Sequence, residues 1–203
     1  MAEEKFDAIV VGAGPAGTSA ALTMAKAGLN VVLLERGDYP GAKNVQGAVM
    51  YTKMLDEIVP GFWKDPQAPI ERPITEQKIW VLSKDSMFQV GFKSEKWLAV
   101  PANCFTVIRA NFDRWFAKKA EEAGAQLFTG VTVKEGIKKD GKVVGIKTSE
   151  GDELYADVVI AADGVNSLLA QSLGLLDEWK PDEVALGVKE VLALPREKIE
   201  DRF

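Results

Sequence analysis

Three glycines near the N-terminus are the first residues whose spacing could bind a ligand. Gly12, Gly14 and Gly17 follow a short apolar run in the order G-x-G-x-x-G. At this spacing the first glycine permits a tight turn, the second lets backbone approach a pyrophosphate, and the third lets a helix pack closely on a sheet. Pro15 and Ala16 would begin that helix, whose positive end faces the phosphates and whose first turn tolerates a missing N–H. The pattern predicts a dinucleotide site; the alternative is a turn that only packs a helix against a strand.

Glu35 provides a group suited to the sugar of such a dinucleotide. It lies 18 residues after Gly17, at the end of the next apolar run. A carboxylate there can accept hydrogen bonds from both ribose hydroxyls, and it would repel the 2′-phosphate of NADP. NAD and FAD sites share the glycines and the acidic residue, so these residues leave the choice between the two cofactors open.

The elements around these residues predict a β-α-β unit. Residues 6–11 and 31–34 are short apolar runs rich in branched side chains, as in strands buried on both faces. Residues 15–27 have a helical pattern that ends at Gly28, where a left-handed cap is expected. Strand, glycine turn, helix and strand within about 30 residues indicate an α/β fold with a Rossmann-like dinucleotide-binding domain.

The remaining elements are predicted from apolar spacing and turn residues. Residues 38–47 form a glycine-containing loop, and residues 60–73, with four prolines, form an irregular connection. Asn111 is expected to cap a helix that ends at Gly124. Strands are expected at 79–82 and 87–92 (a hairpin), 106–109, 126–133, 142–147, 153–155, 157–161 and 184–194, and further helices at 51–58, 165–173 and 196–203.

A second set of motifs lies further along the chain. Ala162, Asp163 and Gly164 follow a predicted buried strand and precede a helix, and Arg109 lies between a strand and a helix. From the residues alone, Asp163 could be a simple turn residue and Arg109 could make a surface salt bridge. Together with the glycine motif, they resemble the flavoprotein superfamily that includes aromatic hydroxylases and geranylgeranyl reductases. That resemblance implies FAD as the cofactor, with the Asp-Gly turn and the arginine near it.

Three longer segments, 35–47, 108–116 and 184–190, resemble the FixC family, relatives of electron-transfer-flavoprotein:quinone oxidoreductase. The resemblance covers the whole chain and is most specific at 38–47, where an ordinary surface connection is the alternative. It implies that this loop passes near the flavin ring and the pyrophosphate. The cofactor contacts implied here are Arg36, Lys43, Asn44, Gln46 and Gly47, together with a backbone contact from Val133 near the adenine.

The same resemblance implies a function. Family members receive electrons from a paired electron-transfer flavoprotein and pass them through FAD to a membrane quinone. They do so in FixABCX-type complexes that contain a small ferredoxin-like subunit and are associated with electron bifurcation. The flavin carries the chemistry, so no catalytic acid or base is expected from the protein. Two alternatives remain: a reductase or monooxygenase of the superfamily that uses NAD(P)H, and an assembly subunit whose flavin is only a relay.

Composition narrows the remaining classes of function. The chain has no histidine and one cysteine, Cys104, so these residues provide no His ligands for zinc, no Ser-His-Asp triad and too few thiols for an iron–sulfur cluster. No metal site is expected, and Cys104 is expected to be a buried packing residue. A net charge of -5 without a basic cluster gives no reason to expect nucleic acid. No apolar run reaches the roughly 20 residues of a membrane span. Residues 2–4 do not resemble a signal peptide, so the expected location is the cytoplasm. The resemblance to the FixC family implies peripheral association with the inner face of the cell membrane.

The sequence suggests a division into two domains. Residues 1–75 and 102–180 are expected to form the FAD-binding domain, and residues 76–101 and 181–203 the first pieces of a β-sheet domain for the quinone. The late Gly-Asp motif with which this flavoprotein fold normally closes around FAD has no match here. We therefore expect a protein about twice this length, and weak FAD binding by these residues alone.

Overall fold

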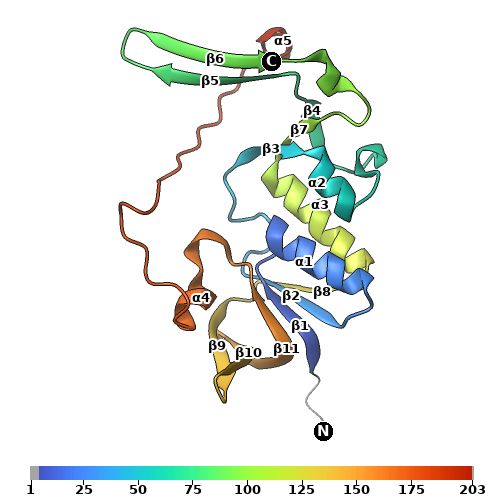
Figure 1. Cartoon of the computed structure of the whole chain (residues 1–203), viewed down its shortest axis with the longest axis vertical. Helices are drawn as coiled ribbons and strands as arrows, with labels where there is room; N and C mark the ends of the chain where they lie inside the picture. The colour runs from blue at the N-terminus through green and yellow to red at the C-terminus, as the bar shows by residue number, and fades with distance from the viewer. Residues whose placement is uncertain (1–4, 203) are drawn as a thin grey trace.

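A six-stranded sheet forms the base of the molecule in the computed structural model, which describes residues 5–202 (Figure 1). Its strands lie in the order β8-β2-β1-β11-β10-β9. The four parallel strands are β1 (Phe6–Val11), β2 (Val31–Glu35), β8 (Gln126–Thr129) and β11 (Glu153–Ala161). The antiparallel strands β9 (Val133–Lys139) and β10 (Lys142–Thr148) extend one edge. The α/β, Rossmann-like fold class is thus confirmed.

The predicted β-α-β unit is present with nearly the expected bounds. Helix α1 (Pro15–Lys26) connects β1 to β2, and Gly28 after it has a φ of +82°. Helix α3 (Arg109–Glu122) lies beside α1 on the same face of the sheet (Figure 1). Both central strands are buried because helices cover one face and the side chains of Val133, Ile146, Leu169 and Leu173 pack on the other, which is why their sequences are continuously apolar.

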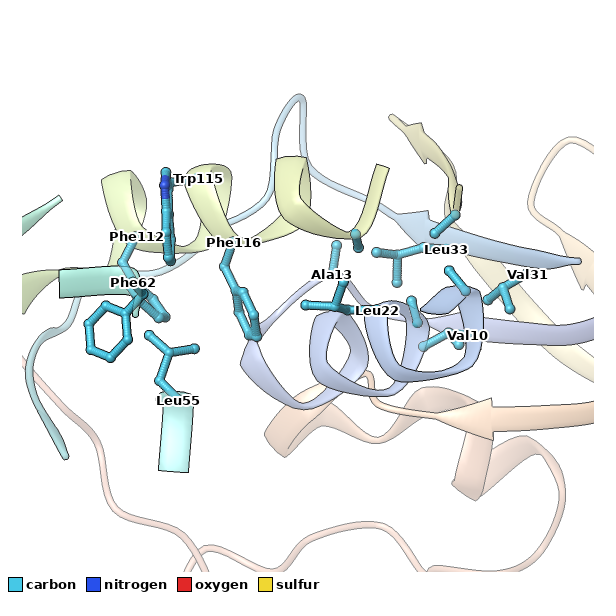
Figure 2. Close-up of a cluster of buried hydrophobic side chains, with 14 of the residues drawn as sticks. Val10, Ala13, Leu22, Val31, Leu33, Leu55, Phe62, Phe112, Trp115 and Phe116 are labelled. Carbon is cyan, nitrogen blue, oxygen red and sulfur yellow. The ribbon is translucent and has the colours of Figure 1, made fainter. Parts of the chain in front are cut away.

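The buried side chains form two clusters, one on each face of the sheet. Along β1, Ala8 and Val10 belong to the cluster under the helices, whereas Ile9 and Val11 face the opposite cluster. Figure 2 shows the first cluster, which runs from Val10 beneath α1 to a group of aromatic rings on and around α3. Its members there include Phe62, Phe112, Trp115 and Phe116. The cluster therefore joins the main sheet to the rest of the molecule.

A small three-stranded sheet lies beyond the amino end of α3. Its order is β3 (Gly47–Tyr51), β7 (Cys104–Ile108) and β4 (Ile70–Pro73), all paired antiparallel. Along the chain, α2 (Thr52–Ile58) and the short 3-10 helix η1 (Phe62–Lys64) lie between β3 and β4. Cys104 is completely buried there, as expected. β3 and β4 were not predicted, because residues 47–51 and 70–73 are only half-buried and take strand form by pairing with β7, far along the chain.

A separate hairpin extends from the small sheet. Strands β5 (Glu76–Leu82) and β6 (Met87–Lys93) pair only with each other, and the short turn η2 (Glu95–Leu98) leads back toward β7. The predicted hairpin is confirmed, with longer strands than expected. It stands apart from the six-stranded sheet in Figure 1.

Several sequence predictions are wrong in detail. Asn111 does not cap α3: the helix begins at Arg109 directly after β7, with Ile108 at its N-cap and no side-chain cap, so Asn111 lies within the first turn. The predicted strand 126–133 is two strands, because Gly130 turns the chain with a φ of +74°. The two predicted strands 153–155 and 157–161 form one continuous strand, β11. Its first residues pair with β10 and its later residues pair with β1.

The C-terminal segment differs most from expectation. The predicted helix 165–173 is the turn η3 (Gly164–Asn166) and α4 (Leu168–Ser172), separated at Ser167, which has a φ of +45°. Residues 184–194 form no strand, since no strand within residues 5–202 pairs with them. Helix α5 (Arg196–Arg202) is close to the predicted 196–203. Residues 2–4 and Phe203 lie outside the described part of the chain.

Asp65 fastens the loop after η1 to helix α3. Its carboxylate accepts hydrogen bonds from the Gln67 backbone N–H at 2.8 Å and the Trp115 indole at 3.2 Å. It also pairs with the Lys119 ammonium at 3.1 Å. The Gln67 hydrogen bond, followed by that of Lys119, lowers the pKa of Asp65. These three contacts hold the loop after η1 against α3.

Replacing Phe116 by alanine tests the aromatic junction. Phe116 is 2% exposed and packs against Phe112 and Trp115. Phe116→Ala is expected to lower the free energy of unfolding by about 3–5 kcal/mol, because a buried ring leaves a cavity. Chemical denaturation of the intact protein measures this change. Phe128→Ala, at a ring that is 47% exposed on β8, is the control and should change the free energy by about 0.5 kcal/mol. Equal effects of the two substitutions would contradict the proposed junction.

Candidate functional site

A cavity of about 320 Å³ lies at the carboxyl ends of the parallel strands β1, β2 and β11. Ligands bind outside this edge in open α/β sheets. The cavity collects predicted residues from six separate segments: Gly12, Gly14, Pro15, Ala16, Glu35, Arg36, Lys43, Asn44, Arg109, Val133, Ala162, Asp163 and Gly164. Three predicted residues, Gly17, Gln46 and Gly47, are not part of its lining.

The three glycines of the motif have different surroundings. A Cβ at Gly12 would lie 2.3 Å from the Ala162 carbonyl oxygen, and φ there is +103°. A Cβ at Gly17 would lie 1.9 Å from the carbonyl oxygen of Gly12, so Gly17 packs the helix rather than lining the cavity. A Cβ at Gly14, by contrast, would meet nothing within 4 Å. Gly14 therefore opens a cradle in the cavity at the start of α1, which fits the approach of a pyrophosphate.

The start of α1 offers unpaired donors to this cradle. Pro15 lies at the first turn, and no side chain among the described residues caps the helix. The first backbone N–H groups of a helix have no intrahelical acceptor, and the helix dipole favours an anion there. Arg36 and Lys43 also line the cavity, and neither forms an ion pair with another described residue. The surroundings of Gly14 thus fit a pyrophosphate in both hydrogen bonding and charge.

Glu35 is held rigidly at the end of β2. One carboxylate oxygen accepts the Ala13 backbone N–H at 3.0 Å, and the other accepts the Gly37 N–H at 2.7 Å. Each oxygen of an ionised carboxylate has a further lone pair, so both can still accept a hydroxyl hydrogen. The carboxylate therefore links the glycine turn to β2 and remains available at the cavity for a ribose. That ribose contact stays a prediction.

Arg109 forms a bidentate ion pair with Asp113, one turn further along α3. Its Nε and Nη2 donate to the two carboxylate oxygens at 2.7 and 2.9 Å. The side chains of Arg109 and Asp113 are 18% and 2% exposed, so this is no surface salt bridge. Asp113 also lines the cavity and was missed in the sequence, although its i+4 spacing from Arg109 is a signal that could have found it.

Asp163 has a structural contact as well as a place in the cavity. Its carboxylate accepts the Leu169 backbone N–H at 2.8 Å, which ties the turn after β11 to the start of α4. Ala162 donates its N–H to Val11 at 2.8 Å, and Gly164 has a φ of +73°. The contact of Asp163 is thus the one that a turn residue makes, and the turn it holds forms one wall of the cavity.

The loop 38–47 contributes only part of what was expected of it. Gly41, Lys43 and Asn44 line the cavity. Gln46 is exposed: its N–H donates to the Asn44 side-chain oxygen at 2.8 Å and its carbonyl accepts the Arg109 N–H at 3.3 Å. Gly47 begins β3 and pairs with Ile108. Lining residues that sequence reasoning missed continue known motifs, namely Val131 and Thr132 before Val133, and Val165, Asn166 and Leu168 after Gly164.

Comparison with known proteins defines the class of protein to which this fold and cavity correspond. A profile described as FAD dependent oxidoreductase matches residues 7–172, and the chain therefore belongs to that family of oxidoreductases. FAD is accordingly the cofactor. The described residues contain no helix long and apolar enough to cross a membrane.

Two proteins named FixC are similar to this chain along its whole length. The chain is 50% identical over 205 residues to Protein FixC of Azorhizobium caulinodans and 46% identical over 203 residues to Protein FixC of Escherichia coli K12. Both alignments cover 100% of this chain and 47% of the relative, so the chain spans about half the length of these proteins.

Two solved flavoprotein structures resemble the fold. A geranylgeranyl bacteriochlorophyll reductase-like protein from Thermoplasma acidophilum has a TM-score of 0.71 and 30% identity, covering 85% of this chain and 43% of its own. The myxobacterial chondrochloren halogenase CndH, an FAD-dependent halogenase, has a TM-score of 0.63 and 25% identity, covering 83% and 39%.

Alanine at two of the glycines tests the separate roles of the motif. Gly14→Ala should leave folding intact, because its Cβ meets no atom, but should weaken FAD binding by about tenfold or more, because the methyl group occupies the cradle. Gly17→Ala should instead lower the unfolding midpoint, since its Cβ would collide with the Gly12 carbonyl. Fluorescence titration of the intact apoprotein with FAD and thermal unfolding measure the two effects. Similar FAD affinity of Gly14→Ala and wild type would contradict the cradle.

Proposed function

We propose that the intact protein carries electrons through FAD from an electron-transfer flavoprotein to a membrane quinone, as the FixC-type subunit of a FixABCX-type complex. The observation that carries this proposal is the identity of 46–50% with proteins named FixC along the whole chain. The proposal includes electron-transfer flavoprotein subunits and a small ferredoxin-like subunit as partners. Electron bifurcation and peripheral contact with the inner face of the cell membrane belong to the same proposal.

The chemistry of the cavity supports a role that depends on the cofactor alone. Bound FAD supplies the redox chemistry, and the residues of this chain bind it, orient it and limit access of water. Glu35 suits the ribose, and the start of α1 with Arg36 and Lys43 suits the pyrophosphate. The chain has no histidine to act as an acid or base. An electron relay needs none.

The β5–β6 hairpin supports a contact with an apolar phase or partner. Four consecutive apolar residues of β5 are exposed. Because successive side chains of a strand point to opposite faces, the hairpin exposes large apolar side chains on both faces. These residues are Ile79, Trp80, Val81 and Leu82 on β5, and Met87, Phe88, Val90 and Phe92 on β6. Exposed apolar patches of this kind mark interaction surfaces. This supports placing the hairpin in the part of the protein that meets the quinone and the membrane.

A second candidate function is that of an FAD-dependent reductase or monooxygenase that takes hydride from NAD(P)H. The observation that favours it is the TM-score of 0.71 and 30% identity to the geranylgeranyl bacteriochlorophyll reductase-like protein. A third candidate is an assembly subunit whose flavin is only a relay between partners. The three differ in which donor reduces the flavin and which acceptor reoxidises it.

Rapid-mixing reduction of the full-length protein separates these candidates. We expect the flavin absorbance to bleach with the reduced partner flavoprotein but not with NADH or NADPH alone, and to recover on addition of a short-chain quinone. A mixture without the partner is the control. Direct bleaching by NAD(P)H would favour the reductase or monooxygenase, and bleaching by the partner without recovery in quinone would favour the relay.

Charged residues on the hairpin test its proposed contact. Val81 and Phe88 are cross-strand neighbours that are 61% and 67% exposed. The double substitution Val81→Glu/Phe88→Glu should reduce co-sedimentation with lipid vesicles severalfold while leaving flavin content unchanged, because neither side chain lines the cavity. Lys84→Glu at the turn of the hairpin adds acidic charge without removing apolar surface and serves as the control. Unchanged co-sedimentation of the double variant would contradict the contact.

A further inference from the structure

Asp113 is the only buried charged side chain in the described part of the chain. Both of its carboxylate oxygens accept hydrogen bonds, and both donors belong to Arg109. A buried charge is costly unless it is paired and hydrogen-bonded. The pair is therefore a single neutral unit in the wall of the cavity, with the side chain of Asp113 2% exposed and that of Arg109 18% exposed.

The guanidinium has donors to spare. Of its five N–H groups, Asp113 engages one on Nε and one on Nη2, which leaves three. No other hydrogen bond from the guanidinium forms within residues 5–202. Two parallel hydrogen bonds fix the plane of an arginine fork, so the remaining three donors are held in that plane with fixed directions.

The loop 38–47 covers this pair. At Gly41, a Cβ would lie 3.1 Å from the Asp113 Cβ and 3.0 Å from the Ala110 Cα. Gly41 has a φ of +88°, and its lack of a side chain lets the loop backbone pass directly over the first turn of α3. This contact excludes water from Asp113, and two charges interact more strongly away from water than at an exposed surface.

Arg109 lines two neighbouring cavities. It lines the cavity together with the Gly14 cradle and Glu35, and it also lines an adjoining apolar groove of about 330 Å³ between α1, α2, β3 and α3. With its ribose at Glu35 and its pyrophosphate at Gly14, a bound dinucleotide has its other half left to extend. We infer that Arg109 meets the flavin half of FAD.

We propose that Asp113 is a positioning residue that fixes the plane of the Arg109 guanidinium, so that free donors of Arg109 meet the flavin half of FAD, and that cancels the charge of the arginine there. This inference rests on the proposed FAD site. An uncompensated cation beside the flavin would stabilise added electrons, so a neutral pair keeps the reduction potential of the bound flavin lower than an unpaired arginine would. The pair thus supplies hydrogen bonds without net charge.

The test is the midpoint potential of the flavin in the full-length protein, measured by anaerobic titration against a reference dye, together with the FAD dissociation constant. Asp113→Asn keeps the shape but removes the negative charge. It should favour the reduced flavin at least tenfold, a rise of about 30 mV for a two-electron couple. Arg109→Gln leaves the carboxylate unpaired and, at a pH high enough to keep it ionised, should shift the ratio tenfold in the opposite direction. The double variant Arg109→Gln/Asp113→Asn is neutral again. Its ratio of reduced to oxidised flavin should therefore return to within about threefold of the wild-type ratio.

Asp65→Asn is the matched control, because Asp65 also binds α3 but lies outside the cavity. It should leave the potential unchanged. Two results would overturn the proposal. One is a ratio of reduced to oxidised flavin in Asp113→Asn that lies within twofold of wild type at the same applied potential; the other is an equal shift in Asp65→Asn. If Asp113→Asn does not hold flavin, Arg109→Gln and the double variant are compared instead, and equal potentials of those two would overturn it. Loss of flavin from both single variants with retention by the double variant would support the neutral pair. Loss from all three would overturn the proposal, because the pair would then be a requirement of the fold.

Neither measurement needs a partner or a quinone, since dithionite or an enzymatic reductant supplies the electrons. Failure of the electron-transfer flavoprotein to reduce the protein would count against the proposed function and leave the charge-pair result standing. Wild-type protein without FAD would count against the proposed function before any variant is made.

Discussion

Close contact between backbone segments at the first glycine turn is the constraint on which the rest of the site depends. The end of β1, the start of α1 and the end of β11 meet where Gly12 and Gly17 leave no room for a Cβ. The Ala162 N–H donates to Val11 in the same place. Because three elements touch there through backbone alone, the start of α1 and the turn after β11 are held beside the same cavity.

The polar residues of the cavity are then fixed from this contact outward. Glu35 connects the glycine turn to the end of β2 through the Ala13 and Gly37 N–H groups. Asp163 secures the turn at the end of β11 by accepting the Leu169 N–H. Each carboxylate thereby has a structural role that also places it at the cavity. The rigidity that a dinucleotide site requires comes from hydrogen bonds to backbone rather than from side chains alone.

The cations of the cavity fall into two kinds. Arg36 and Lys43 lack an ion-pair partner among residues 5–202, and their charge is available to a phosphate. Arg109 is neutralised by a buried partner and offers direction without net charge. This difference would suit the proposed FAD site, because an anionic pyrophosphate is bound by charge and an uncharged ring by oriented hydrogen bonds.

The sequence by itself determined the β-α-β unit, the glycine turn, the place of Glu35 and the burial of Cys104. These follow from local signals, namely apolar runs, turn residues and a fixed spacing, which depend only on neighbours along the chain. Residues 165–173 show the limit of these local signals, because an apolar pattern could not reveal that Ser167 interrupts the helix.

The tertiary structure alone decided that β3 pairs with β7, that Gln46 lies outside the cavity and that Asp113 is buried against Arg109 beneath Gly41. It also left residues 184–194 without a strand partner in the described chain, although they alternate like a strand. Pairing and burial are set by segments far apart in the sequence, so no local pattern encodes them.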